Sequence, residues 1–318
     1  MSAGSGDPVG ALPGVAHEVS DGIYAYIQPD GTWWINNCGF LAGRSGVIVV
    51  DSCATERRTR ALREVIGRVS PAPVRTLINT HHHGDHTHGN CLFDTATIVA
   101  HDRTRQAVLA EGTPPTSRLI ATGSWEPVDW GVLEVAPPFL TYTDGVSVYS
   151  DDLRCEVRYV GTPAHTTNDS TVWVPDRKVL FAGDLLFNAG TPFLVMGSLA
   201  GALEAVEALS GYGAETIVPG HGPVAGPELI GDVLRYLRFV QQVAAEAKSA
   251  GLSPLAAARE VDLGEFADLT DSERIVGNLH RAYLELDGHP RGAPLSDPRE
   301  VLADMVAFNG GRPLSCHA

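Results

Sequence analysis

The sequence lacks a long apolar run. No apolar stretch approaches the ~20 residues needed to span a bilayer, and the N-terminus lacks the charged-then-apolar order of a secretory leader. The five cysteines, at positions 38, 53, 91, 155 and 316, form no C-x-x-C pair, which is typical of reduced thiols rather than of a disulfide framework. We therefore expect a cytoplasmic protein without a membrane partner.

Basic residues are scarce. Lys and Arg number 23 against 38 Asp and Glu, so the formal net charge is -15. No Lys/Arg-rich stretch interrupts this acidic background, and a negative field repels a phosphate backbone. We therefore expect no nucleic-acid partner, which disfavours a metal-dependent nuclease. The hydrophobic share of 44% and the charged share of 19% indicate a folded globular chain.

Short apolar runs separated by glycine-rich turns predict strands, and longer amphipathic stretches predict helices. Residues 1–14, rich in Gly, Ala, Ser and Pro, are expected to form a disordered tail. Residues 15–226 contain two β-then-α halves, the second opening near residue 140. They predict an α/β fold with four layers, αββα, in which two sheets face each other between helices. Residues 227–318 predict a helical C-terminal region that covers the active-site cleft.

Four metal-capable side chains crowd into six residues directly after the predicted strand 74–78. They are His81, His83, Asp85 and His86 in the segment T-H-H-H-G-D-H. His81 and His83, two apart on extended chain, share one face, while a tight turn at Gly84 lets Asp85 and His86 face a second point nearby. Because zinc takes about four ligands, this loop needs partners from elsewhere in the chain.

Three further candidate ligands follow predicted strands and lie among residues that permit tight turns. They are His165, Asp184 and His221. We expect them to meet the histidine loop at one rim of the sheets. Two neighbouring cations lower the pKa of a shared water to near neutrality and polarise a carbonyl or phosphoryl group. Hydrolysis is therefore the expected chemistry, with Asp85 as the catalytic residue that orients the hydroxide.

This ordered set, together with the strand-ending Asp51, resembles the metallo-β-lactamase superfamily over roughly residues 17–225. The resemblance implies two Zn²⁺ ions, although imidazole and carboxylate ligands suit iron and manganese as well. It also implies that Asp51 steadies the ligand loop through hydrogen bonds. It assigns His81, His83 and His165 to the first metal, Asp85, His86 and His221 to the second, and Asp184 to both.

Single residues narrow the choice within the superfamily. Asp184 argues against true β-lactamases, which lack this bridging carboxylate, and His83 stands where the flavin-partnered di-iron oxidoreductases have Glu, which disfavours a redox enzyme. Residues 221–223 and the helical C-terminal region lack the Tyr and basic residues by which glyoxalase II enzymes hold glutathione. A glyoxalase II-like thioesterase or a lactonase of primary metabolism is therefore the alternative function.

Several further segments resemble the late-ring cyclases of actinorhodin-type aromatic polyketide pathways. This resemblance implies an acyl-thioesterase and cyclase of antibiotic biosynthesis, which closes a ring by an aldol reaction and hydrolyses the thioester. The small-molecule acyl substrate would then be presented by an acyl carrier protein. The segments are residues 197–201, 221–227, 255–259, 278–283 and 308–311.

Aromatic residues make up only 7% of the chain, yet four of the five tryptophans lie in two predicted connections. We expect these rings to form an apolar platform for the substrate; the alternative is that they seal the edge of the sandwich. Residues 137–139 are expected to line the same rim, where few Lys or Arg residues lie. The predicted substrate-binding residues are Trp33, Trp34, Trp125, Trp130 and Phe193.

Overall fold

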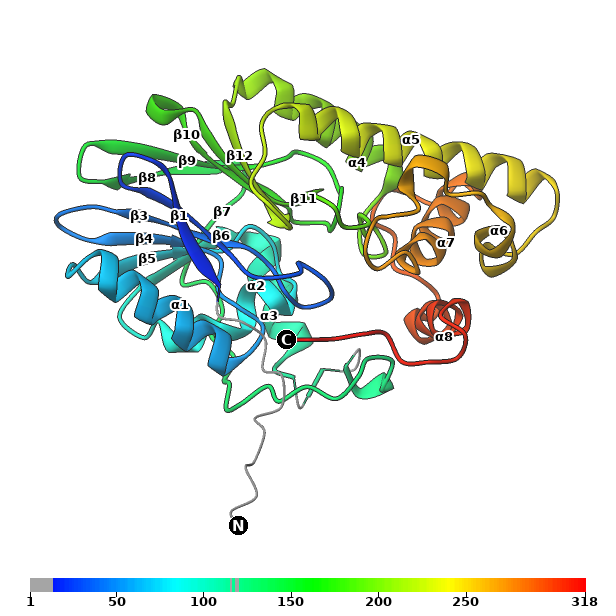
Figure 1. The fold of residues 1–318 in the computed structure, drawn as a ribbon, viewed down its shortest axis with the longest axis horizontal. Coiled ribbons are helices and arrows are strands. Elements are labelled where there is room, and N and C mark those ends of the chain that lie inside the picture. Colours follow the sequence, from blue (N-terminus) through cyan, green and yellow to red (C-terminus); the bar gives the residue numbers. More distant parts are fainter. Residues whose placement is uncertain (1–13, 115, 118–119) are drawn as a thin grey trace, which may run out of the picture.

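Two β-sheets lie face to face with helices on their outer sides, as Figure 1 shows. The computed structural model describes residues 14–114, 116–117 and 120–318. The predicted four-layer αββα architecture is confirmed. The tail predicted at residues 1–14 lies outside the described residues except for Gly14.

The first sheet has seven strands in the order β1 to β7, antiparallel from β1 to β4 and parallel from β4 to β7. The prediction that the second half opens near residue 140 is wrong, because β7 pairs with β6 in the first sheet. β1 escaped prediction because it is a mostly exposed edge strand without an apolar run. The strands are β1 (Val15–Ser20), β2 (Ile23–Ile27), β3 (Cys38–Ala42), β4 (Val47–Val50), β5 (Val74–Ile78), β6 (Thr97–His101) and β7 (Leu140–Tyr142).

The second sheet has five strands in the order β12-β11-β10-β9-β8. Its inner face packs on that of the first sheet: Leu41, Ile48 and Val50 share one buried cluster with Val157 and Val172. This apolar layer holds the two sheets in a fixed relation. The strands are β8 (Gly145–Ser150), β9 (Leu153–Tyr159), β10 (Ser170–Val174), β11 (Val179–Phe187) and β12 (Thr216–His221).

Amphipathic helices cover the outer faces of the sheets. Helix α1 (Glu56–Val69) buries Leu62 and Ile66 against the first sheet, and the Thr55 side chain caps its N-terminus by accepting from the Arg58 amide. The short α2 (Gly84–Thr87) and α3 (Asp102–Glu111) lie on the same side. Helices α4 (Leu199–Ala208) and α5 (Glu228–Ser249) pack against β11 of the second sheet.

The chain after α5 forms a helical group beside the sandwich (Figure 1). It comprises α6 (Pro254–Glu260), α7 (Arg274–Leu286) and α8 (Pro298–Phe308). The last residues return to the N-terminal half, where the Leu314 amide donates a 2.7 Å hydrogen bond to the Ser124 carbonyl. Within the described part of the chain, the helices are too short or too polar to cross a membrane.

Candidate metal and active site

The candidate ligands gather where the central strands end. Strands β4 and β5 are parallel neighbours, and each leads directly into a site segment: Asp51 after β4, and residues 79–86 after β5. In the facing sheet, Asp184 lies within β11 and His221 ends β12, which runs parallel to it. Since parallel strands place their carboxyl ends at one edge, the topology brings these residues together.

The seven predicted ligands form two overlapping groups. Within each group, one ligand-capable atom from every residue lies within 4.8 Å of the others. Asp184 belongs to both: its Oδ1 lies 3.1 Å from His86 Nε2, and its Oδ2 lies 3.3 Å from His165 Nε2. The groups are His81, His83, His165 and Asp184, and Asp85, His86, Asp184 and His221.

Hydrogen bonds at Nδ1 fix the orientation of three of the imidazole rings. In each, Nδ1 faces a hydrogen-bond acceptor and thereby leaves Nε2 directed toward the acidic side chains of the site. This fixes both the ring orientation and the nitrogen available to a metal. The pairs are His86 with Asp51 Oδ2 (2.9 Å), His221 with the Gly31 carbonyl (3.0 Å) and His165 with the Phe193 carbonyl (2.5 Å).

Asp51 is buried in an uncommon backbone conformation, with φ of 60°. A left-handed φ is rare for a residue other than glycine and persists where surrounding interactions hold it. Those interactions are on its carboxylate, which accepts hydrogen bonds from the Thr80 amide and hydroxyl at 2.8 Å each and faces His86 Nδ1. Asp51 therefore links the end of β4 to the loop that carries the histidines.

Replacing Asp51 by asparagine should weaken metal binding by about 10- to 100-fold, because an amide cannot accept all three hydrogen bonds. Asparagine tolerates the left-handed conformation, so the variant isolates the hydrogen bonds from the backbone. Titration against a chelating dye measures the affinity. Asp151→Asn is the matched control, because Asp151 also has a positive φ, of 51°, but lies in a surface turn. Equal affinity in Asp51→Asn and the wild-type protein would refute the assigned role.

The charges of the site suit a cation. Burial alone would raise the pKa of the Asp184 carboxyl, but His86 and His221 hold that pKa well below its usual range. Burial and the neighbouring His86 lower the pKa of His81 far below that of a free imidazole. Burial alone would lower the pKa of His221 too, but the Asp184 and Asp85 carboxylates raise it to about 9. We therefore expect metal binding to compete with protonation of His221.

Unsatisfied polar atoms at the centre of the site support the same conclusion. His81 Nε2, His86 Nε2 and Asp184 Oδ1 are buried and form no hydrogen bond of good geometry among the described residues, although the last two atoms lie 3.1 Å apart as an ion pair. Buried polar atoms without partners are rare in folded proteins, since each costs about 1–3 kcal/mol. A divalent cation between these atoms would satisfy all of them at once, so the residues fit a metal centre.

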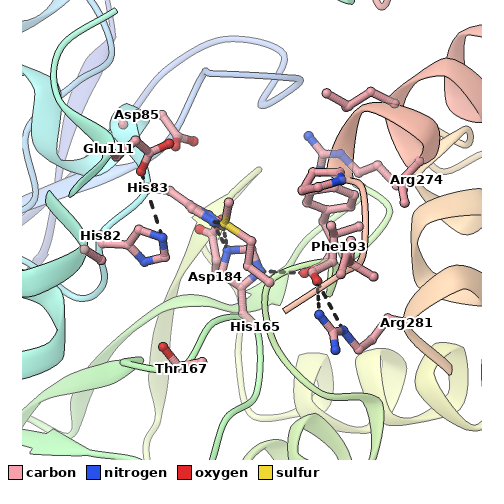
Figure 2. A pocket seen from close by; sticks show the side chains of 18 of the residues that line it. His82, His83, Asp85, Glu111, His165, Thr167, Asp184, Phe193, Arg274 and Arg281 are labelled. Atoms are coloured by element: carbon pink, nitrogen blue, oxygen red, sulfur yellow. Dashed lines mark hydrogen bonds and ion pairs between the residues drawn. The ribbon is translucent and has the colours of Figure 1, made fainter. Parts of the chain in front are cut away.

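The site opens into a cavity of about 320 Å³, seen in close-up in Figure 2. Four of the five predicted aromatic residues line it: Trp33, Trp34, Trp125 and Phe193. The rings pack edge to face, for example Trp33 on Phe193 with centroids 5.0 Å apart. Trp130 does not line this cavity. Its ring packs edge to face against Trp34, with centroids 5.0 Å apart.

Residues 137–139 do not line the cavity. Phe139 is 85% exposed, and its amide donates to the Ile98 carbonyl beside β6. The expectation for this segment is wrong because it leads into β7, and β7 belongs to the edge of the first sheet.

The structure adds polar cavity residues that the sequence did not single out. Arg274 and Arg281 reach the cavity from α7 and Glu111 from the end of α3, contrary to the expectation of few basic groups there (Figure 2). Burial, and then the Asp85 charge, raise the pKa of Glu111 to about 7. The two arginines stand seven apart, a spacing that places them on one face of a helix, and this signal was available in the sequence.

Comparison with known proteins agrees with this geometry. The chain is 27% identical over 185 residues to 2,4-dinitroanisole O-demethylase subunit alpha of a Nocardioides strain, covering 57% of this chain and 51% of that protein. It is 29% identical over 145 residues to the hydroxyacylglutathione hydrolase of Rhodospirillum rubrum, covering 45% of each. The chain thus spans about half the length of these curated relatives.

A solved structure shares the fold. The metallo-β-lactamase from Pontibacter korlensis superposes with a TM-score of 0.56 at 22% identity, covering 71% of this chain and 99% of that one. The model of the metallo-beta-lactamase superfamily matches residues 31–221, which include the whole set of predicted metal ligands. The paired sheets, the order of the ligands and this match together show that the chain belongs to the metallo-β-lactamase superfamily.

Proposed function

We propose that the protein is a binuclear metal-dependent acyl-thioesterase that acts on aromatic, polyketide-like acyl groups presented by a carrier protein. The observation that carries this proposal is one cavity that joins the metal-capable His/Asp groups to a wall of aromatic rings. Superfamily membership supports metal-dependent hydrolysis. The resemblance to aromatic polyketide cyclases supports the acyl class and adds an aldol ring closure in the same cavity.

The seven ligands would hold two divalent cations, with Zn²⁺ as the proposed metal and Asp184 shared between both. Divalent ions in such a site polarise an acyl carbonyl and lower the pKa of a water molecule. The protein's own part is to fix the ligand directions through Asp51 and the carbonyls of Gly31 and Phe193.

Asp85 has the further role of orienting water. Its carboxylate lies 3.3 Å from His221 Nε2 and lines the cavity. Burial alone would raise its pKa, but His86 and His221 hold the pKa of Asp85 well below the usual range. It therefore stays ionised, accepting a hydrogen bond from water rather than donating a proton.

The aromatic wall favours a flat acyl group. Buried rings offer large apolar area, and an aromatic pair adds about 0.5–1.5 kcal/mol beyond area burial. One relative is named a hydroxyacylglutathione hydrolase, and an acylglutathione is a thioester. The similarity to this relative therefore supports thioester chemistry. A glyoxalase II-like substrate remains the second candidate on that ground.

Release of free thiol from the 2-naphthoyl thioester of N-acetylcysteamine is the direct test. We expect turnover that is lost after treatment with a chelator and restored by Zn²⁺. A rate unaffected by chelation, or no turnover of any acyl thioester by metal-loaded protein, would overturn the proposal.

Trp125 allows the aromatic part of the proposal to be tested separately. Trp125→Ala should lower kcat/KM for the naphthoyl thioester by about ten-fold and for the acetyl thioester far less, because only the larger group reaches the ring. Trp130→Ala is the matched control, since that ring lies behind Trp34 and off the cavity. Equal losses on both thioesters would mean that Trp125 is structural.

A further inference from the structure

Among the described residues, Arg281 is a buried cation with no carboxylate at ion-pair distance. It lies on α7, is 1% exposed, and lines the cavity. In the part of the chain that the structure describes, no acidic side chain forms an ion pair with it. The nearest acid along the helix, Glu285, directs its two oxygens to the amides of Leu199 and Ala200 at 2.8 and 3.1 Å.

The other cavity arginine is different. Arg274 forms an ion pair with Asp271 at 2.7 Å, and its guanidinium stacks on Trp33, 4.2 Å from the ring centroid. Its charge is therefore compensated within the protein. Arg281 lacks such an ion pair: burial lowers its pKa, and the Glu285 charge raises that pKa only from longer range. A buried charge without a close partner is costly.

The hydrogen bonds of Arg281 leave some of its guanidinium N–H groups without an acceptor. Nε and Nη2 both donate to the Val195 carbonyl, and Nη1 donates to the Ala293 carbonyl at 2.7 Å. A guanidinium carries five N–H groups, so one remains on each terminal nitrogen. One N–H group on each of two neighbouring nitrogens is therefore left for a ligand, and a guanidinium can bind both oxygens of a carboxylate.

The position of Arg281 relative to the metal-capable groups bears on which ligand the cavity can hold. Figure 2 shows Arg281 and Arg274 on the α7 side, with His82, His83, Asp85 and Glu111 on the opposite side. The cavity lining also includes the apolar side chains of Phe193, Val301 and Leu302. Asp184 and His165 lie between the two sides (Figure 2), so a ligand held at the metal-capable groups can extend toward the guanidinium on the α7 side.

We propose that Arg281 binds a carboxylate of the substrate, remote from the thioester that is cleaved. This inference rests on the proposed function and narrows the substrate class to aromatic acyl thioesters that bear a free carboxylate. A single guanidinium matches a monoanion, which favours a carboxylate over a phosphate dianion. Arg281 is then a residue that determines specificity.

Binding of 6-carbamoyl-2-naphthoate (the naphthoate), whose amide stands in for the thioester, and of the neutral 2,6-diamide (the naphthamide) to the metal-loaded protein, measured by calorimetry, tests the proposal without turnover. We expect Arg281→Gln to weaken naphthoate binding at least ten-fold and to leave naphthamide binding unchanged. Arg291→Gln, an exposed arginine paired with Glu204, is the matched control. Equal weakening of both ligands would show that Arg281 only supports the loop at Val195. Unchanged naphthoate binding would show that the carboxylate is held elsewhere, the metal centre included. Either result overturns the proposal.

Arg281→Lys covers the case in which the glutamine variant does not fold. Lysine keeps the charge but loses the fork, so we expect the preference for naphthoate over naphthamide to fall at least three-fold. An unchanged preference would overturn the inference. Loss of thioester turnover on every substrate would count against the proposed function only, because ligand binding is measured independently of it.

Discussion

Replacing Asp184 by alanine should remove one of the two proposed metal ions and lower kcat by at least about 1,000-fold. Asp184 lies between the two ligand groups, 3.1 Å from His86 Nε2 of one and 3.3 Å from His165 Nε2 of the other. Without its carboxylate the two cations would repel each other with no intervening negative charge, and both groups would lose a ligand. Elemental analysis of the dialysed protein gives the metal content, and thiol release gives the rate.

Two further variants control this experiment. Asp184→Asn keeps the shape but not the charge, so it should lose metal almost as completely. Asp176→Ala removes an exposed acid from the turn between β10 and β11 and should change neither quantity. An Asp184→Ala protein that retains both ions and full turnover would contradict the shared position of Asp184.

Ending the chain at Gly226 should give insoluble protein without activity. The deletion removes α5 to α8, which cover Leu186, Leu199 and Val206 in one continuous buried cluster. It also removes Arg281 and the α8 wall of the cavity. Newly exposed apolar surface of this size drives aggregation. Sedimentation and thiol release check the result; a soluble fragment with full activity would show that the C-terminal helices are dispensable.

A point variant measures the same packing in the intact chain. Leu279 of α7 is fully buried, so Leu279→Ala should lower the free energy of unfolding by about 2–5 kcal/mol. Leu286→Ala on the same helix should change that free energy by less than about 0.5 kcal/mol, because Leu286 is 52% exposed. Urea denaturation followed by tryptophan fluorescence compares them. Equal effects would mean that the inner face of α7 contributes little.

Local patterns in the sequence were sufficient to predict the fold where elements are regular. The β-branched run 74–78 has the predicted bounds, because β-branched residues favour extended backbone. The assignment of β7 failed because pairing with β6 depends on distant residues and not on the composition of residues 140–142.

The residues of the candidate site could likewise be predicted only in part from local sequence. His81 to His86 are close in sequence, so their grouping could be predicted from spacing. His165, Asp184 and His221 were candidates because they follow predicted strands, but their assignment to the two metals required the family resemblance, since strand ends converge only in three dimensions. The seven-residue spacing of Arg274 and Arg281 places both on one helix face, but Arg281 was missed because nothing local shows whether that face is buried or solvated. Its role depends on the absence of an ion pair with Glu285, which only the fold establishes.

One comparison of rates tests the central claim most directly: kcat/KM of the Zn²⁺-loaded protein for the 2-naphthoyl thioester, a cephalosporin and bis(p-nitrophenyl) phosphate. The aromatic cavity wall, the Asp184 carboxylate and the net charge of -15 predict that the thioester is cleaved at least about 100-fold faster than either competitor. Faster turnover of the cephalosporin or the phosphodiester than of the thioester would contradict the account.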